Sequence, residues 1–185
     1  MTTLAQGEVA RGAKVTLREK RLGDAWNDYR WRSQAELSRF DAARPLTITY
    51  PEYLALYREE LLYPSPYRRG LAIEDEQGRH IGNIMYYNID ALRQEAELGV
   101  TIGEPEYWSK GYGTEALRLV VEHLLGKPGF RRVYLKTLDW NSRARRSFEK
   151  VGFVEYGRAQ RAGNSFTLME IRREWLTPSE RTTTS

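Results

Sequence analysis

Two glycines at the start of an amphipathic segment are the residues whose type and spacing first suggest chemistry. Gly111 and Gly113 enclose Tyr112, and a helical pattern begins directly after them at Thr114. Glycine lets the backbone come close to a ligand, and a helix start offers unpaired N–H groups with partial positive charge. The combination predicts a binding site for phosphate oxygens, although an isolated glycine pair is equally typical of an ordinary turn.

The turn lacks the features of two other phosphate-binding motifs. No Lys-Ser or Lys-Thr pair follows Gly113, so the turn is not a Walker loop. It also lacks the third glycine of the dinucleotide-binding fingerprint. The turn by itself therefore indicates neither of these two ligand classes.

A strand and a helix have to hold this turn in place. Leu98, Val100 and Ile102 alternate with residues of a different character, which predicts a strand, and Pro105 ends it because proline has no N–H to donate. After the turn, the apolar residues follow helical spacing and form one stripe: Leu117, Val120, Val121, Leu124 and Leu125. The sequence therefore predicts a strand-turn-helix unit with the glycines at its centre.

A second block of interest covers residues 138–153. It follows a predicted strand over residues 132–138, and Asn141 caps a short helix that runs to Lys150 and is closed by Gly152. The block ends in Glu-Lys-Val-Gly-Phe (residues 149–153).

Together the two blocks resemble the GNAT superfamily of N-acetyltransferases, and within it the group of ribosomal-protein N-terminal and spermidine acetyltransferases. The first block is similar to the acyl-CoA motif: an acidic residue, a strand, then Trp-x-Lys-Gly-Tyr-Gly-Thr-Glu-Ala (residues 108–116). The second carries the Asn and the Glu-Lys-x-Gly-Phe of the family. The resemblance covers roughly residues 13–175. It implies an α+β fold in α/β/α layers, with a mixed, mostly antiparallel sheet splayed in the middle, flanked by about four helices, and acetyl-CoA beside the central strand.

The resemblance also implies which residues hold acetyl-CoA. Backbone amides in the turn would bind the pyrophosphate: Ser109, Lys110, Gly111, Tyr112, Gly113 and Thr114. The pantetheine arm would run beside the central strand like a missing strand, along Val100, Thr101 and Ile102. Asn141 would reach the same arm, and Arg146, or alternatively Arg143, would meet phosphates.

The implied reaction needs a base, because an amine at pH 7 is mostly protonated. The resemblance implies Glu97 for this role, with Glu95 as the alternative, while a solvated strand residue is an equally good reading of Glu97. The leaving thiolate lacks its usual proton donors, because Phe148 and Ala144 stand where the family often has Tyr and Ser. Ser147 is expected to point elsewhere, so the thiolate leaves unassisted or another hydroxyl, such as Tyr112 or Tyr156, serves.

Composition excludes several other kinds of site. The chain of 185 residues contains no cysteine, which rules out a disulfide framework, a thiolate nucleophile and a zinc-thiolate site. His80 and His123 are too few and too far apart for a metal cluster, so no metal is expected. The net charge of +4 is spread along the chain, which makes nucleic acid an improbable partner. There is no apolar run of about 18 residues and no signal-peptide core, so we expect a cytoplasmic protein without membrane contact.

The remaining pattern predicts one domain. A flexible lead over residues 1–12 precedes a single domain over 13–176, and a polar tail covers 177–185. Further elements are predicted from alternation, caps and turn residues: strands over 15–18, 71–74, 80–87, 153–161 and 165–172, and helices over 25–32 and 51–61.

Two alternatives to an N-acetyltransferase stay open. One is a non-catalytic acyl-CoA sensor with a GNAT fold, which the missing hydroxyls at Ala144 and Phe148 favour. The other is a nucleic-acid or ribosome-binding accessory protein, for which no motif exists. For an enzyme, the amine acceptor is a peptide N-terminus or a small molecule, because balanced charges in the first two helices argue against a polycation. A homodimer is compatible with the pattern.

Overall fold

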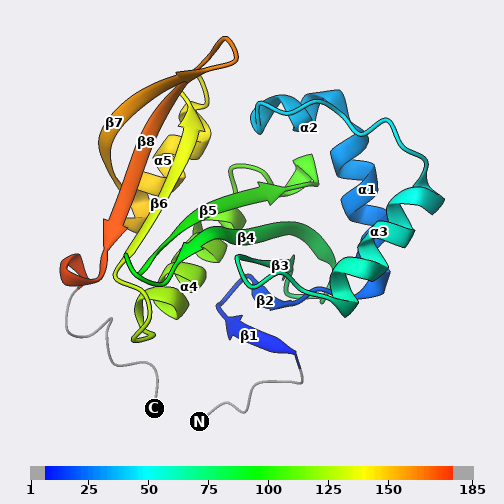
Figure 1. The fold of residues 1–185 in the computed structure, drawn as a ribbon, viewed down its shortest axis with the longest axis horizontal. Coiled ribbons are helices and arrows are strands. Elements are labelled where there is room, and N and C mark those ends of the chain that lie inside the picture. Colours follow the sequence, from blue (N-terminus) through cyan, green and yellow to red (C-terminus); the bar gives the residue numbers. More distant parts are fainter. Residues whose placement is uncertain (1–6, 177–185) are drawn as a thin grey trace.

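An eight-stranded sheet forms the centre of the protein in the computed structural model, which describes residues 7–176 (Figure 1). The strand order across the sheet is β1-β2-β3-β4-β5-β6-β8-β7, and β5 with β6 is the one parallel pair among the described residues. The strands are β1 (Glu8–Arg11), β2 (Thr16–Glu19), β3 (Arg68–Glu74), β4 (His80–Asp90), β5 (Glu95–Ile102), β6 (Arg132–Leu138), β7 (Val154–Arg161) and β8 (Asn164–Arg172). The predicted mixed, mostly antiparallel sheet is confirmed.

Five α-helices accompany the sheet in the described part of the chain: α1 (Ala25–Ser33), α2 (Ala35–Phe40), α3 (Tyr50–Leu62), α4 (Tyr112–Leu125) and α5 (Ser142–Val151). Four of them match the predicted helices. The sequence analysis missed α2, because six residues are too few to show a helical period. Figure 1 shows α1, α2 and α3 grouped together, apart from β6, β7 and β8.

The sheet opens between β5 and β6. These strands pair only at Glu95–Arg132, Ala96–Val133 and Glu97–Tyr134, whereas β4 follows β5 from Asp90–Glu95 to Gly82–Ile102. Beyond Glu97, β6 continues beside β8 and separates from β5, as Figure 1 shows. Part of the β5 edge is therefore left without a strand partner, and the N–H and C=O groups of that edge need other partners.

The main core lies between α4 and the sheet. The predicted apolar stripe of α4 is buried, with Leu117, Val120, Val121, Leu124 and Leu125 each at most 2% exposed. It packs against strand residues such as Leu17, Ile84 and Leu135. Burying each of these side chains contributes about 1.5–3 kcal/mol, so the core fixes α4, and the turn before it, firmly against β5.

The predicted lead-in over residues 1–12 is wrong for part of its length. Residues 8–11 form β1, which pairs antiparallel with β2, and Val9 and Ala10 pack against the main core. Four residues with two charged ends carry too little alternation to reveal a strand. Residues 1–6 of the predicted lead and the predicted tail over 177–185 lie outside the described residues.

The turn after β1 is tied to the start of α4. The Glu115 carboxylate in the first turn of α4 accepts hydrogen bonds from the backbone N–H groups of Ala13, Lys14 and Val15, at 3.0, 2.7 and 2.8 Å. A carboxylate near a helix N-terminus is also favoured by the helix dipole. Within residues 7–176, no helix is both long and apolar enough to cross a membrane.

Candidate functional site

A cavity of about 610 Å³ lies where the sheet opens. Its wall is formed by β4, β5, the turn before α4, β6, α5 and the end of α2. Most of the predicted acetyl-CoA contacts lie in this wall: Val100, Thr101, Ile102, Ser109, Gly111, Gly113, Thr114, Asn141 and Arg146. Folding thus brings the two sequence blocks to opposite sides of one space.

The turn before α4 has the backbone geometry of an anion cradle. Gly111 is the N-cap of α4 and has a φ of 91°, a left-handed conformation that favours glycine. Ser109, two residues earlier, also has a positive φ of 60°, which is uncommon for a residue with a side chain and marks a site held by its surroundings. The N–H groups of the first turn of α4 have no partner within the helix. This arrangement suits a phosphate group.

The side chains of Lys110 and Tyr112 do not line the cavity. The Lys110 carbonyl accepts a hydrogen bond from Lys14 Nζ at 2.7 Å, and that ammonium lies 5.5 Å from the centre of the Tyr112 ring. The Tyr112 hydroxyl donates to Glu76 at 3.1 Å. These contacts hold the turn from outside, so Lys110 and Tyr112 can serve a ligand only through their backbone amides.

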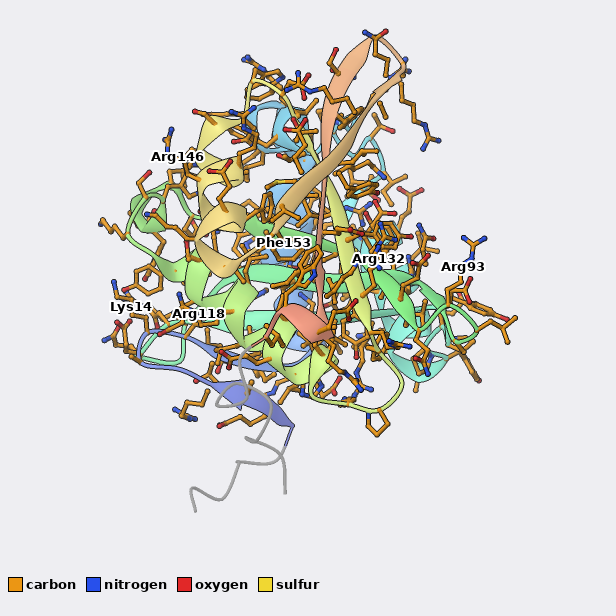
Figure 2. All side chains as sticks on the ribbon, turned by 90° about the vertical axis from the view of Figure 1, so that its left-hand side faces the viewer. Lys14, Arg93, Arg118, Arg132, Arg146 and Phe153 are labelled. Atoms are coloured by element: carbon orange, nitrogen blue, oxygen red, sulfur yellow. The ribbon has the colours of Figure 1, made fainter. Side chains whose placement is uncertain are left out.

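Basic side chains surround this end of the cavity. Figure 2 shows Lys14, Arg118 and Arg146 along one side of α4 and α5. Arg146 and Lys150 both lie in the cavity wall. Positive charge on the side of α4 and α5 favours a polyanionic ligand.

Asn141 has the predicted capping role. Its side-chain oxygen accepts a hydrogen bond from the backbone N–H of Ala144 at 3.2 Å, and α5 ends at Gly152, whose φ is 108°. Both predicted helix ends are therefore confirmed. The cap uses one lone pair of the Asn141 oxygen, so the NH2 group and the second lone pair stay available to a ligand.

An aromatic and arginine cluster connects the two sides of the opening. The Arg143 guanidinium lies 4.0 Å from the centre of the Trp108 ring and 5.0 Å from that of Phe40. Phe40 also packs against Trp140, with ring centres 5.4 Å apart. Residues from α2, the turn, the β6–α5 connection and α5 thus meet in one cluster. The sequence analysis missed it because Phe40 lies on the unpredicted helix α2.

Glu97 is buried beside the cavity rather than in its wall. It is 6% exposed, and its carboxylate accepts hydrogen bonds from Lys136 Nζ at 2.7 Å, the Tyr87 hydroxyl at 2.9 Å and Asn88 Nδ2 at 2.9 Å. Tyr87 and Lys136 do line the cavity. Burial, and then the neighbouring Glu97 carboxylate, raise the pKa of Tyr87, so its hydroxyl stays a donor. The alternative, Glu95, forms an ion pair with Arg132 at 2.8 Å.

Asp41 is the one acidic residue in the cavity wall among the described residues. It follows directly after α2 and lies beside the Thr101 side chain. Asp41 is exposed by its surface area, and the protein atoms packed around its carboxyl nevertheless raise the pKa of that group to about 6. The sequence analysis did not single it out, since a lone aspartate between two helices carries no signal.

Phe148 and Ala144 both line the cavity. Phe148 is 6% exposed and packs edge-on against Phe153, with ring centres 5.9 Å apart. The expectation that Ser147 points elsewhere is wrong, since it also lies in the wall; a short helix over an open space exposes more than one face. Tyr156, offered as an alternative donor, does not line the cavity. The described residues contain no group of three or more potential metal ligands.

Comparison with known families and proteins gives two matches in sequence. Residues 14–154 match the family model described as the acetyltransferase (GNAT) domain. The Bacillus subtilis (strain 168) protein named "Putative ribosomal N-acetyltransferase YdaF" is 30% identical over 83 residues, which is 45% of this chain and 45% of that protein. The match thus spans less than half the length of this relative.

Solved structures share the fold. A spermidine N-acetyltransferase from Vibrio cholerae, in complex with CoA and spermine, superposes with a TM-score of 0.78 at 21% identity, covering 88% of this chain and 98% of that one. The aminoglycoside acetyltransferase AAC(6')-Ib, in complex with coenzyme A, gives a TM-score of 0.74 at 22% identity, covering 92% and 99%. At these identities the likeness concerns the fold.

Proposed function

The chain belongs to the acetyltransferase (GNAT) family, and on that premise we propose that it transfers the acetyl group of acetyl-CoA to a primary amine. The observation that carries this proposal is the cavity at the sheet opening. One end of it meets a glycine-bearing helix start, and one wall is the part of β5 that has left β6. A long ligand with a phosphate end and an amide-containing arm fits both features.

The residues of this chain can hold such a donor along its whole length. We propose that the backbone amides of residues 109–114 bind the pyrophosphate and that Arg146 meets a phosphate. Residues 100–102 offer main-chain groups to the pantetheine arm, and the NH2 group of Asn141 donates to it. Bound there, acetyl-CoA supplies an activated acyl group. The aromatic cluster of Phe40, Trp108 and Arg143 shields part of the site from water.

The proposed role of Glu97 follows from its three donors. As the predicted base it would have to act through Tyr87 or Lys136, because these two side chains stand between its carboxylate and the cavity. Its contacts support a positioning role as well: the Glu97 side chain holds the Lys136 ammonium and keeps the Tyr87 hydroxyl oriented. Both groups can then donate hydrogen bonds to a ligand at the point where β5 and β6 separate.

The acceptor of the proposed reaction is a small-molecule amine or the N-terminus of a peptide. The names of the relatives suggest both kinds of acceptor. One is named "Putative ribosomal N-acetyltransferase YdaF", and others are named as spermidine or aminoglycoside acetyltransferases. Another structure of the Vibrio cholerae enzyme is described as dodecameric. We propose that this chain also self-associates, at least as a homodimer.

Mass spectrometry of products tests the proposed function. The protein is incubated with acetyl-CoA and a pool of peptides with free N-termini, monoamines, polyamines and aminoglycosides, and products heavier by one acetyl group are identified. A matched sample with Gly111→Val, at an acetyl-CoA concentration near the Kd of the parent, is expected to give much less product, because the phosphate cradle is crowded and affinity for the cofactor falls. Tight acetyl-CoA binding by the parent without any acetylated product would instead favour the non-catalytic sensor. The missing hydroxyls at Phe148 and Ala144 are the sequence feature that supports this alternative.

A further inference from the structure

We propose that Asp41 receives the ammonium group of the acceptor and takes its proton. This inference rests on the proposed function and deepens it, because it assigns the acceptor side of the cavity. Asp41 is a wall residue of that cavity and lies beside Thr101 of β5, the strand along which the acyl donor is proposed to run. An amine bound to Asp41 therefore lies next to the donor arm.

Among the charged side chains around the cavity, Asp41 differs from the other carboxylates in its lack of an ion-pair partner within the described residues. Four basic side chains line the wall, namely Lys136, Arg143, Arg146 and Lys150; Lys136 is paired with Glu97, and the other three suit the anionic donor. Other carboxylates close to the opening are already paired, Glu97 with Lys136 and Glu104 with Arg30. Asp41 has no such ion pair in the described part of the chain, and Arg32 acts on it only at longer range. It is thus the one wall carboxylate with capacity for an incoming cation.

The backbone holds Asp41 in place. Its N–H donates to the Ser38 carbonyl at 3.2 Å, and the Ala43 N–H donates to the same oxygen at 2.9 Å. Ala42 between them has a φ of 51°, so the chain reverses sharply at the end of α2. Ser38 is buried and its hydroxyl donates to the Arg32 carbonyl at 3.3 Å. A carboxylate on such a fixed turn can hold an acceptor in one position.

The protonation state of Asp41 suits this role. Burial raises the pKa of its carboxyl to about 6, while the Thr101 hydroxyl and the Arg32 guanidinium act in the opposite direction. At neutral pH the carboxylate is ionised and ready to accept a proton, and a base with a pKa near the working pH is the most effective. The other charged or titratable side chains that line the cavity are Tyr87 of β4, Tyr107 before the glycine turn, Lys136 of β6, and Arg143, Arg146 and Lys150 of α5.

The proposed step balances in protons and electrons. The acceptor R–NH₃⁺ gives one proton to Asp41, and the freed nitrogen lone pair attacks the carbonyl carbon of the thioester. A C–N bond forms and the C–S bond breaks, with its electron pair leaving on sulfur. The nitrogen then sheds its second proton, which ends on the sulfur of CoA. Asp41 returns its proton to water before the next cycle.

The same charge pattern selects the class of acceptor. One carboxylate in a wall that also carries Arg143, Arg146 and Lys150 favours an acceptor with a single positive charge next to the reacting nitrogen, such as a peptide N-terminus or a monoamine. A polyamine would bring further ammonium groups into this wall, where like charges repel.

The test compares Asp41→Asn with two other amide variants across pH. Acetyl transfer to a peptide with a free N-terminus, to n-butylamine and to spermidine is measured from pH 5 to 9, together with the Kd for acetyl-CoA. The matched control is Glu36→Gln on α2, which removes the same charge from an exposed residue outside the cavity wall. The third variant is Glu97→Gln. Thermal unfolding of each variant confirms that it is folded.

We expect Asp41→Asn to lower kcat/KM by about 10²-fold at pH 7, to remove the fall in rate below about pH 6, and to leave the Kd for acetyl-CoA unchanged. Glu36→Gln should match the parent, and spermidine should be the poorest of the three acceptors. A parent-like pH profile in Asp41→Asn, or loss of the acidic limb in Glu97→Gln alone, would overturn this inference and leave the proposed function intact. A parent that acetylates none of the probes while binding acetyl-CoA would overturn both.

Discussion

The two sides of the cavity differ in how they are built. The proposed donor side consists of the turn before α4, the edge of β5 and the start of α5, and the groups proposed to bind the cofactor there are mostly main-chain atoms fixed by local geometry. The acceptor side consists of the end of α2 with Asp41, and of Tyr87 and Lys136 from β4 and β6. Its functional groups are side chains that come from segments far apart in the sequence.

This difference separates what is general from what is particular to this chain. A helix start with a left-handed glycine offers main-chain N–H groups to a phosphate, and these are present whatever side chains surround it. A single wall carboxylate depends on the placement of each side chain around it, so a relative with the same fold can differ there entirely. Substitutions on the donor side should therefore change cofactor affinity, and those on the acceptor side should change turnover and pH dependence.

The largest expected effect is on the donor side. Gly111→Val puts a β-branched residue at a φ of 91° and crowds the phosphate cradle. We expect affinity for acetyl-CoA to fall about 100-fold, equal to the loss of one or two charge-assisted hydrogen bonds, measured by calorimetric titration. Gly163→Val is the matched control, because Gly163 has a φ of 77° in the turn between β7 and β8. Equal affinities of the two variants for acetyl-CoA would contradict the proposal that the turn before α4 binds the pyrophosphate.

The next effect concerns Glu97, which stands between the two sides. Glu97→Gln puts an amide donor among Lys136, Tyr87 and Asn88, so one of these donors loses its acceptor. We expect kcat to fall about 30-fold with the acidic limb of the pH profile retained and the Kd for acetyl-CoA unchanged. A loss of 10²–10⁴-fold that removes this limb would identify Glu97 as the base.

A gain of activity is expected at α5. Phe148 lies in the cavity wall without a hydroxyl, so Phe148→Tyr adds a proton donor for the leaving thiolate with little change in volume. If thiolate departure limits turnover, kcat should rise by up to about tenfold. Ala144→Ser, one turn earlier, offers a second donor from the same wall. A lower rate in a folded Phe148→Tyr protein would show that packing against Phe153 is what the phenyl ring provides.

The smallest expected effect is on stability. The carboxyl of Asp41 has a pKa of about 6 in the folded protein, above its ordinary value of 3.8, so folding favours the protonated form. Its ionisation destabilises the fold fully above about pH 6, and this cost disappears below the unfolded pKa. Asp41→Asn should therefore be more stable than the parent at pH 7, by about 1 kcal/mol after screening by cavity water, and equal to it near pH 3.5. Denaturant melts at both pH values, with Glu36→Gln as control, measure this difference.

The sequence by itself determined the fold class, the strand-turn-helix unit and the helix ends that adjoin the proposed donor side. The apolar stripe of α4, the cap at Asn141 and the closing Gly152 were all predicted where the structure has them. These features depend on residues close together in the chain. Their apolar, capping and glycine positions can therefore be recognised in the sequence without knowledge of tertiary contacts.

Tertiary structure decided the rest. β1 and α2 are too short to show a period in the sequence. β1 packs on the main core and is followed by a turn that the Glu115 carboxylate holds, and α2 is held by ring contacts of Phe40 with Trp108 and Trp140. The side-chain environments were likewise undetermined: Glu97 became a buried, triply bonded carboxylate, and Asp41 became the wall acid beside Thr101. A carboxyl group takes its pKa and its partners from residues that only folding brings near, which is why the acceptor side could not be read from the sequence.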